Sequence, residues 1–222
     1  MEHMQFSDPS DVLRDLTDRY PALLGMTKEL RQAFSLLRTT FQTGGKLLAC
    51  GNGGSAADAL HIVGELMKSF CKLRPMDADT AAALAVRFPE DAPFLTEKLE
   101  RTLPAVALVE NAALNTAVQN DTASKLVFAQ QVYGLGRRED CLLCISTSGN
   151  AKNCVYAAET AKAMGMPVIA LTGAKPSALS TLADCTLAVP EEETYRVQEL
   201  HLPVYHALCL MLECYFFGGE SV

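Results

Sequence analysis

The chain has 222 residues, of which 49% are hydrophobic and 20% are charged, and its formal net charge is -7 at pH 7. This length and hydrophobic content predict one globular domain, spanning residues 1–222, that buries a substantial core. The acidic balance excludes a nucleic-acid surface on the chain itself, because such a surface needs a basic stripe that displaces counterions from phosphates.

Two helices are expected at the start of the chain, within residues 9–43. Apolar residues recur there at spacings of three and four, which is the period of one buried helix face. These positions are Val12, Leu13, Leu16, Leu30, Phe34, Leu37 and Phe41. Gly44 and Gly45 then end the second helix.

Five short apolar runs follow, and each has the length and composition of a buried parallel strand. They are KLLAC (46–50), AVALV (105–109), CLLCIS (141–146), PVIALT (167–172) and CTLAVP (185–190). Helical patterns lie between the runs, and this alternation predicts an α/β sandwich around a mostly parallel sheet. In such folds, ligands bind beyond the carboxyl ends of the strands.

The segment 76–102 differs from the rest of the chain. Its sequence, MDADTAAALAVRFPEDAPFLTEKLERT, carries mixed charges and no strand signal. It predicts short helices that are broken at Pro89 and Pro93. We therefore expect a helical insertion beside the sheet.

The cysteines and the N-terminal residues bear on the compartment. The eight cysteines lie mostly within apolar runs and lack the paired spacing of a zinc ribbon or a disulfide-stapled secreted domain. The first residues show no basic region followed by an apolar core, which opposes a signal peptide. No uncharged apolar run approaches the about 20 residues that a membrane helix needs. The sequence predicts a cytoplasmic protein with buried free thiols and no membrane partner.

A glycine-rich turn follows the first strand, in the stretch LLACGNGGSAADALHIVGEL (47–66). Glycines let the backbone approach an anion, and the following helix presents free N–H groups and the positive end of its dipole. Ser55 adds a hydroxyl. The turn is therefore typical of a phosphate-monoester site, although a tight turn with Ser55 as a simple helix cap explains the same sequence pattern.

Two well-known nucleotide motifs fit this turn poorly. A Walker P-loop requires a lysine after its last glycine, and no lysine stands there. The loose dinucleotide pattern is present at Gly51, Gly53 and Ala56. However, the helix that follows is expected to run to about Phe70, and no second strand with an acidic residue at its end comes after it to bind a ribose.

The stretch STSGN (146–150) repeats the arrangement of strand, hydroxyl-rich turn and helix, with the helix expected to begin near Ala151. Ser146, Thr147 and Ser148 offer more hydroxyls than one helix cap needs, and hydroxyls donate to phosphate oxygens. A polar loop with a single cap is the simpler alternative. If the turns bind a ligand, the two are expected to converge on it.

His61 and Glu65 are four residues apart, which places both side chains on one face of the helix that begins at the glycine turn. A surface hydrogen bond between them is the simpler interpretation. The C-terminal run VQELHLPVYHALCLML adds Gln198, His201 and His206. A His, Glu, His set can bind a divalent metal or transfer protons, and the spacing alone does not choose between His201 and His206.

The chain resembles the sugar isomerase (SIS) domain family, in its phosphoheptose isomerase branch. Four stretches together carry this resemblance: CGNGGSAADALHIVGEL, ISTSGN, VIALTG and VQELHLPVYH. The resemblance covers most of the chain. It implies a three-layer α/β sandwich with a five-stranded parallel sheet, usually assembled as a homotetramer with active sites near subunit interfaces. It also implies an aldose–ketose isomerase that converts sedoheptulose 7-phosphate to D-glycero-D-manno-heptose 7-phosphate.

The resemblance also assigns roles to individual residues. The zinc ligands that it implies are His61, Glu65, Gln198 and His206. Glu65 and His206 are also the implied acid/base pair, so the resemblance selects His206 over His201. The substrate-binding residues that it implies are Asn52, Gly53, Ser55, Asp121, Ser146, Thr147, Ser148 and Gln198.

Departures from the family pattern keep other functions open. Ala151 stands where the family usually has a serine, Tyr195 stands where it usually has an aspartate, and the segment before Asp121 is longer than usual. An isomerase of another phosphosugar is one alternative. A non-catalytic phosphosugar sensor or an initiator-associating SIS protein is the other, although the latter proteins typically lack the His and Glu that this chain keeps at His61 and Glu65.

Two expectations concern the last helix. Gln198 and His206 are eight residues apart, about 12 Å along an ideal helix at 1.5 Å per residue, which is awkward for one metal. We therefore expect the helix to start late, to bend near Pro203, or to combine with ligands from a neighbouring subunit. The run ALCLMLECYFF (207–217) has more apolar residues than one buried stripe needs, which predicts a subunit contact.

Overall fold

The computed structural model describes residues 6–218, and it contains one five-stranded parallel sheet with the strand order β2-β1-β3-β4-β5. The strands are β1 (Leu47–Gly51), β2 (Ala105–Ala107), β3 (Cys141–Ile145), β4 (Val168–Thr172) and β5 (Cys185–Ala188). Each strand lies within or overlaps one of the five predicted runs, so the predicted α/β fold is confirmed. β2 is shorter than predicted because the Glu110 N–H donates to the Ala107 carbonyl and closes a turn.

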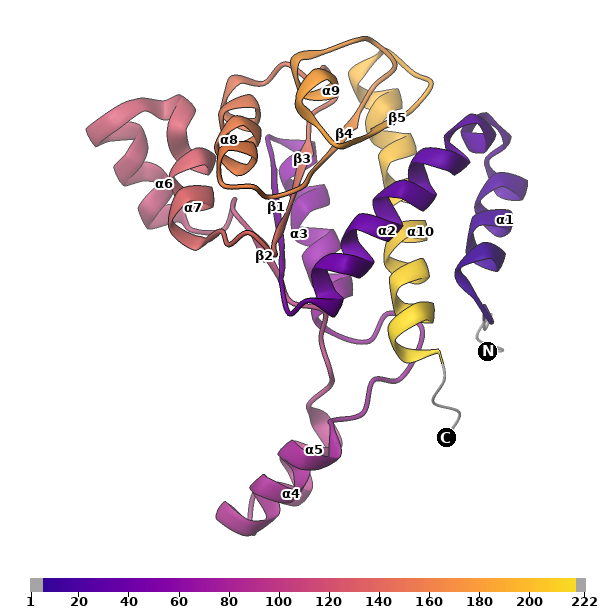
Figure 1. The fold of residues 1–222 in the computed structure, drawn as a ribbon, viewed down its shortest axis with the longest axis vertical. Helices are drawn as coiled ribbons and strands as arrows, with labels where there is room; N and C mark the ends of the chain where they lie inside the picture. The colour runs from indigo at the N-terminus through magenta and orange to yellow at the C-terminus, as the bar shows by residue number, and fades with distance from the viewer. Residues whose placement is uncertain (1–5, 219–222) are drawn as a thin grey trace.

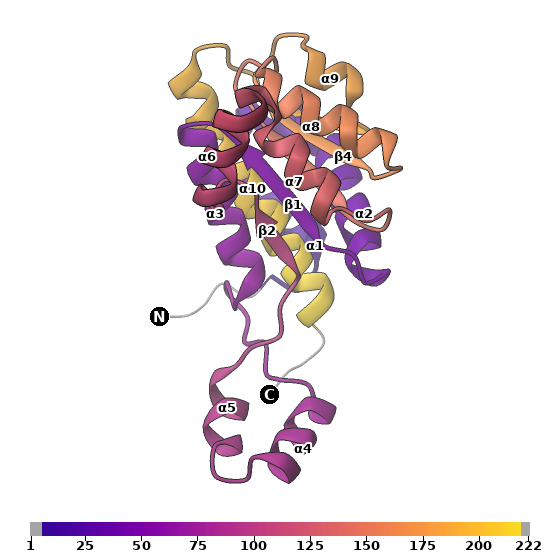
Figure 2. The same ribbon diagram turned by 90° about the vertical axis from the view of Figure 1, so that its left-hand side faces the viewer.

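Helices cover both faces of the sheet and form a three-layer sandwich (Figures 1 and 2). Side chains alternate along each strand, so Leu47 and Ala49 enter one core while Leu48 and Cys50 enter the other. The first core contains residues of α1 (Pro9–Arg19), α2 (Thr27–Gln42), α3 (Gly54–Met67) and α10 (Thr194–Phe217). The second contains residues of α6 (Ala112–Val118), α7 (Val127–Leu135), α8 (Lys152–Ala163) and α9 (Ala178–Leu182).

The two opening helices predicted within residues 9–43 are present as α1 and α2, with a 3-10 turn over Pro21–Met26 between them. The cysteines are all free, and seven of the eight are buried. This agrees with the prediction of buried free thiols.

The C-terminal helix α10 is buried more completely than its sequence predicts. It packs against α1, α2 and α3, and its buried residues include Leu208, Met211, Leu212 and Phe217. Most apolar side chains of this helix are therefore buried within the chain itself, so their number alone does not support a subunit contact. By length and composition α10 could also cross a membrane, but 67% of the relevant segment is buried, as in the core helix of a globular protein.

The predicted helices of the segment 76–102 form an arm that projects from the body of the protein (Figures 1 and 2). The arm contains α4 (Ala78–Arg87) and α5 (Ala92–Lys98). Pro89 separates the two helices as predicted. Pro93 lies in the first turn of α5, where the backbone N–H that proline lacks would have no partner within the helix. Ala92 is the one buried residue of the two helices.

Candidate functional site

A pocket of about 400 Å³ lies at the carboxyl ends of β1 and β3, where the two predicted ligand turns meet. The turns therefore converge, as the repeated pattern of strand, turn and helix predicts. The lining residues are Asn52, Gly53, Gly54, Ser55, Ile145, Ser146, Thr147, Ser148, Ala151, Thr194 and Gln198. No side chain in this set carries a charge, so an anion here would be bound by hydroxyls, N–H groups and helix dipoles.

The helices that begin at the two turns have no side-chain caps. The N-cap residue of α3 is Gly53 and that of α8 is Ala151, and neither residue has a cap side chain, although the Cys154 N–H in the first turn of α8 donates to Asn153 Oδ1 over 3.0 Å. The alternative interpretation of Ser55 as a simple helix cap is therefore wrong. Two helix N-termini with uncapped N–H groups beside one pocket favour the binding of an anion.

Two glycines give the first turn its shape. Gly53 has a φ of 55°, which side-chain-bearing residues rarely adopt. A Cβ atom on Gly54 would collide with the side-chain amide of Gln198, so the glycine lets α10 approach the start of α3.

Sequence reasoning missed two polar residues at this pocket. Thr194, the first residue of α10, lines it. Asn153 forms a reciprocal amide pair with Asn52, with distances of 3.0 Å from Asn52 Nδ2 to Asn153 Oδ1 and 2.8 Å in the other direction. This pair ties the turn after β1 to α8 and fixes the orientation of the Asn52 amide. Asn153 stands three residues after STSGN, a position that spacing alone does not mark.

Helices α3 and α10 run in parallel, and their polar contacts form a seam that begins at the pocket. Gln198 lies against Gly54 at the first level of this seam, and His206 contacts His61 at the next. Both histidines are thus about two helical turns beyond the pocket. We call this set of contacts the α3–α10 seam.

His61, Glu65 and His206 come together on the seam. His61 Nε2 lies 3.2 Å from Glu65 Oε1 and 3.4 Å from His206 Nε2. The Glu65 side chain is 13% exposed, whereas that of His61 is 42% exposed, so the cluster is open to solvent on one side. Burial and then the neighbouring His61 lower the pKa of His206, which keeps its imidazole neutral near pH 7. Three groups able to exchange protons thus lie within contact distance.

The cluster fits a zinc ion in part. Two ligands of one tetrahedral zinc, each bound at 2.0–2.1 Å, are separated by about 3.3 Å, close to both distances measured from His61 Nε2. Within residues 6–218, however, no three His, Cys, Asp or Glu side chains form a complete metal-binding group. Gln198, the fourth ligand implied by the resemblance, lies at the pocket instead.

The course of α10 explains this separation. The helix begins at Thr194, before Gln198, and runs without interruption through Pro203 to Phe217. The expectation of a late helix start is therefore wrong. A ligand from a neighbouring subunit stays a prediction.

His201, the histidine that spacing alone left as a candidate, lies apart from the cluster. Its side chain is fully buried, and its Nδ1 atom is 4.0 Å from Asp58 Oδ2. Burial lowers the pKa of His201 to about 4, so the ring is neutral at pH 7. The seam thus presents His206, and not His201, to His61 and Glu65.

A buried ion pair closes the far end of the seam. The Arg74 guanidinium donates to the Glu65 and Leu66 carbonyls over 3.1 and 2.8 Å and pairs with the Glu213 carboxylate at 2.8 Å. Glu213 also accepts from the Phe70 N–H over 2.8 Å. Arg74 therefore satisfies the last carbonyls of α3, which ends at Met67 and not near Phe70 as the sequence predicts.

Two residues singled out in the sequence lie away from the pocket. Asp121 is exposed on the connection between α6 and α7 and does not line the pocket. Tyr195, which replaces the usual aspartate, is 57% exposed and lies beneath the Arg196 guanidinium.

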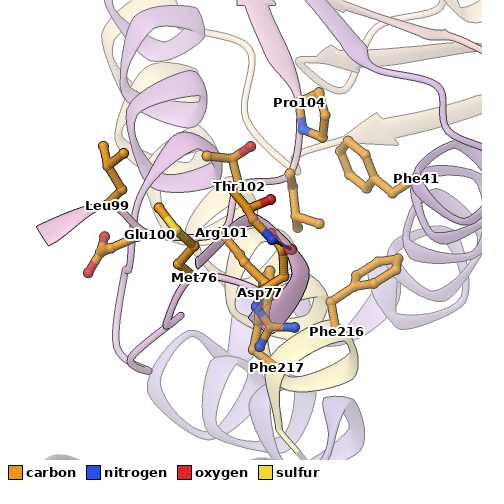
Figure 3. Close-up of a pocket in the computed structure, with 12 residues that line it drawn as sticks. Phe41, Met76, Asp77, Leu99, Glu100, Arg101, Thr102, Pro104, Phe216 and Phe217 are labelled. Atoms are coloured by element: carbon orange, nitrogen blue, oxygen red, sulfur yellow. Dashed lines mark hydrogen bonds between the residues drawn. The ribbon is translucent and has the colours of Figure 1, made fainter. Parts of the chain in front are cut away.

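A second pocket, of about 550 Å³, lies at the root of the arm (Figure 3). Phe41, Phe216 and Phe217 approach it from the body of the protein, and Met76 and Leu99 approach it from the arm. None of the predicted site residues lines it. The candidate active site is therefore the smaller pocket together with the cluster on the seam.

Comparison with known proteins gives consistent matches over most of the chain. The SIS domain family matches residues 22–101 and 80–173. A phosphoheptose isomerase of Akkermansia muciniphila is 33% identical over 204 residues, which cover 92% of this chain and 94% of that protein. One of Helicobacter pylori (strain P12) is 37% identical over 196 residues, 88% of each chain.

Solved structures agree with these matches. The structure of the phosphoheptose isomerase of Neisseria gonorrhoeae superimposes with a TM-score of 0.70 at 32% identity, covering 92% of this chain and 94% of that one.

Proposed function

The chain belongs to the SIS domain family, and from this premise we propose that it is a phosphosugar aldose–ketose isomerase that acts on sedoheptulose 7-phosphate. The observation that carries this proposal is the α3–α10 seam. Along it, the cluster of His61, Glu65 and His206 lies about two helical turns beyond an uncharged, hydroxyl-rich pocket. The pocket supplies binding, and the cluster supplies proton transfer.

The phosphate group is bound at the two turns. Ser55, Ser146, Thr147 and Ser148 offer hydroxyl donors, and α3 and α8 both begin beside the same pocket, so the positive ends of their dipoles add to the binding of an anion. Binding energy from this remote group orients the reactive end of the sugar. Seven residues of α3 separate Gly54 from His61, about 10 Å along the helix. This separation favours an extended sugar over a short one.

The isomerisation moves a proton between adjacent carbon atoms through an enediol, so the site needs a base that removes this proton from carbon and an acid that protonates the carbonyl oxygen. Glu65 serves as one of the pair, because its carboxylate accepts a proton beside His61. His206 serves as the other, because its neutral imidazole both accepts and donates. The two exchange roles between the two half-reactions.

Zinc is the cofactor we propose, held by His61, Glu65 and His206. When bound, it polarises the sugar carbonyl and stabilises the negative charge that develops on its oxygen. Gln198 contacts the start of α3 and acts in this chain as a pocket residue. A fourth ligand would come from the substrate, from solvent or from a neighbouring subunit.

We propose that the protein is a homotetramer, and the arm supports the association of subunits. Helices of ten and seven residues are too short to be stable without packing, yet α4 and α5 bury Ala92 alone and leave Val86, Phe88 and Phe94 more than half exposed. A neighbouring subunit that covers these residues would stabilise the arm. We further propose a cytoplasmic location, with neither nucleic acid nor membrane as a partner.

An isomerase of another phosphosugar is the second candidate, because Ala151 lines the phosphate pocket where a serine would add a hydroxyl. A substrate panel followed by NMR separates the two. With zinc added, sedoheptulose 7-phosphate is expected to be converted and six-carbon phosphosugars to be converted slowly; a chelator stops both. Preferred turnover of a shorter phosphosugar would replace the heptose assignment. Binding without turnover of any substrate would support a sensor.

A further inference from the structure

Behind His61 lie two residues to which neither the motifs nor the proposed mechanism assigns a role. Tyr205, on α10, has its hydroxyl 3.0 Å from His61 Nδ1, on the side of the ring opposite to Glu65 and His206. Its own ring meets that of His61 edge to face, with centroids 5.4 Å apart. Tyr205 is 3% exposed, so its orientation is set by packing within the core.

We propose that Tyr205, which lies near Asp58, is a positioning residue that keeps the proton of His61 on Nδ1 and directs the lone pair of Nε2 toward Glu65 and His206. The consequence for catalysis rests on the proposed function. The protonation pattern itself does not.

The direction of the hydrogen bonds follows from the number of protons available. A carboxylate only accepts, whereas the Tyr205 hydroxyl donates one proton and accepts others. The hydroxyl lies near the Asp58 carboxylate, and burial together with this negative charge raises the pKa of the hydroxyl, so it keeps its proton. If the hydroxyl donates to Asp58, its oxygen is left to accept, and the His61 Nδ1–H is the donor within reach at 3.0 Å.

Other neighbours of Asp58 offer no competing proton. Its Oδ2 atom is buried and has no hydrogen-bond partner within the described part of the chain. His201 Nδ1 is 4.0 Å from Oδ2, too far for a hydrogen bond. Burial raises the pKa of Asp58 to about 6, so the carboxyl is ionised at pH 8. A carboxylate is a stronger hydrogen-bond acceptor than the neutral His61 ring, so it is the preferred acceptor for the hydroxyl proton.

The opposite arrangement would work against the proposed chemistry. If Tyr205 donated to Nδ1, the proton of His61 would sit on Nε2 and point at Glu65 Oε1, 3.2 Å away. That nitrogen could then neither bind a metal ion nor accept a proton. Histidines that bind metals commonly donate their second N–H group to a carboxylate or another acceptor for this reason. Here a tyrosine stands between the histidine and the carboxylate.

The test uses Tyr205→Phe, which removes the hydroxyl and little else, and Tyr215→Phe as the matched control. Tyr215 lies on the same helix, and its hydroxyl accepts from Gln42 Nε2 over 2.8 Å, away from the seam. The chain has four histidines, so NMR spectra of protein labelled with 15N in the imidazole ring are simple enough to assign.

Spectra are recorded at pH 8 on metal-free protein. The proposal expects His61 to carry its proton on Nδ1 in the wild type and in Tyr215→Phe. In Tyr205→Phe, the proton is expected to move wholly or partly to Nε2. A wild-type His61 with its proton on Nε2 would overturn the proposal, and so would a Tyr205→Phe spectrum identical to that of the wild type.

Zinc affinity and turnover then report the consequence. By competition with a chromophoric chelator, Tyr205→Phe is expected to bind zinc about 10–100-fold more weakly, the loss typical of such supporting residues. Turnover is expected to fall in kcat with KM unchanged, and Tyr215→Phe is expected to match the wild type in both. Unchanged zinc affinity and kcat would overturn the catalytic part.

The outcomes also separate this inference from the proposed function. A wild type that converts no phosphosugar but shows the Nδ1–H form and its loss in Tyr205→Phe would refute the isomerase and support the positioning role. A wild type that converts the phosphosugar but carries the His61 proton on Nε2 would support the isomerase and refute the positioning role of Tyr205.

Discussion

The α3–α10 seam and the α4–α5 arm are both helical pairs, but they are stabilised in opposite ways. Along the seam, α3 and α10 contact each other at successive levels, from Gly54 and Gln198 to His61 and His206, and the fully buried pair of Arg74 and Glu213 follows beyond the end of α3. The arm buries Ala92 alone. A site that must hold several groups within a fraction of an ångström needs the first kind of packing. The second kind suits a surface completed by a partner.

The largest expected effect is on turnover, from Glu65→Gln on the seam. This change keeps the size of the side chain and removes its ability to accept a proton, so kcat is expected to fall by about 10²–10⁴-fold. The matched change on the arm is Glu97→Gln, where the carboxylate is 69% exposed, and it is expected to leave kcat unchanged. Steady-state kinetics on the two variants make the comparison. Equal activity in both would show that the seam is not the site of proton transfer.

Next comes the stability of the ion pair at the end of the seam. Arg74→Met leaves the Glu213 carboxylate buried without its partner and removes the donor to the α3 carbonyls, so the free energy of unfolding is expected to fall by about 3–5 kcal/mol. Lys98→Met breaks an exposed pair on the arm and is expected to change it by less than about 0.5 kcal/mol. Urea unfolding measures both. A small effect of Arg74→Met would mean that the seam gains little from this pair.

A smaller change is expected for Ser146→Ala in the pocket. Ser146 is 6% exposed and its hydroxyl lines the phosphate site, so its loss removes a hydrogen bond to a charged group, worth about 1.5–3 kcal/mol. KM should rise about tenfold or more. Ser35→Ala on α2 serves as the control and should leave KM unchanged. An unaltered KM in Ser146→Ala would place the phosphate elsewhere.

The pH dependence of stability tests the buried part of the seam. Burial lowers the pKa of His201 to about 4, so protonation favours the unfolded chain. The stability that the neutral ring contributes is complete above pH ~6.5 and is lost as the pH falls toward 4, by about 2 kcal/mol at pH 5. Asp58 acts in the opposite direction: burial raises its pKa to about 6, so stability falls as the pH rises from about 4 to about 6 and the carboxyl ionises.

His201→Gln isolates the histidine contribution. Urea unfolding at pH 7 and pH 5 should show that this variant loses about 2 kcal/mol less than the wild type on acidification, because it has no ring to protonate. If the two proteins lose the same amount, His201 is not held neutral by burial.

The smallest effect on stability is expected on the arm. Phe94→Ser changes a side chain that is 65% exposed, so unfolding of the isolated chain should shift by less than about 0.5 kcal/mol. If a neighbouring subunit covers the arm, the same change should weaken assembly, and sedimentation velocity should show smaller species. A variant that assembles like the wild type would mean that subunits meet elsewhere.

The same contrast explains what could be predicted from the sequence. The strands are buried on both faces and read as continuous apolar runs, so all five were found. His61 and Glu65 followed from spacing within one helix. Spacing does not reveal Asp58 and Tyr205, because their roles depend on contact between helices that are distant in the sequence; His61 and Tyr205 are 144 positions apart.

Packing between distant elements also explains where the structure departs from the sequence pattern. The pattern extends α3 beyond Met67, whereas Arg74 folds back and satisfies the last carbonyls of the helix. The sequence does not reveal that α1, α2 and α3 pack against the apolar residues of α10, and a subunit contact of this helix stays a prediction. Asp121 is a pocket residue by resemblance, yet it is exposed on the α6–α7 connection in the chain by itself.

The central claim is that the seam joins a phosphate-binding pocket to a separate proton-transfer cluster. The most direct test is to measure binding and turnover of sedoheptulose 7-phosphate on one preparation of His206→Ala, by calorimetry and NMR. The account predicts that this variant still binds the sugar phosphate, because the turns after β1 and β3 are intact, and that it no longer converts the sugar. Retained turnover, or binding lost together with turnover in a folded variant, would contradict the account.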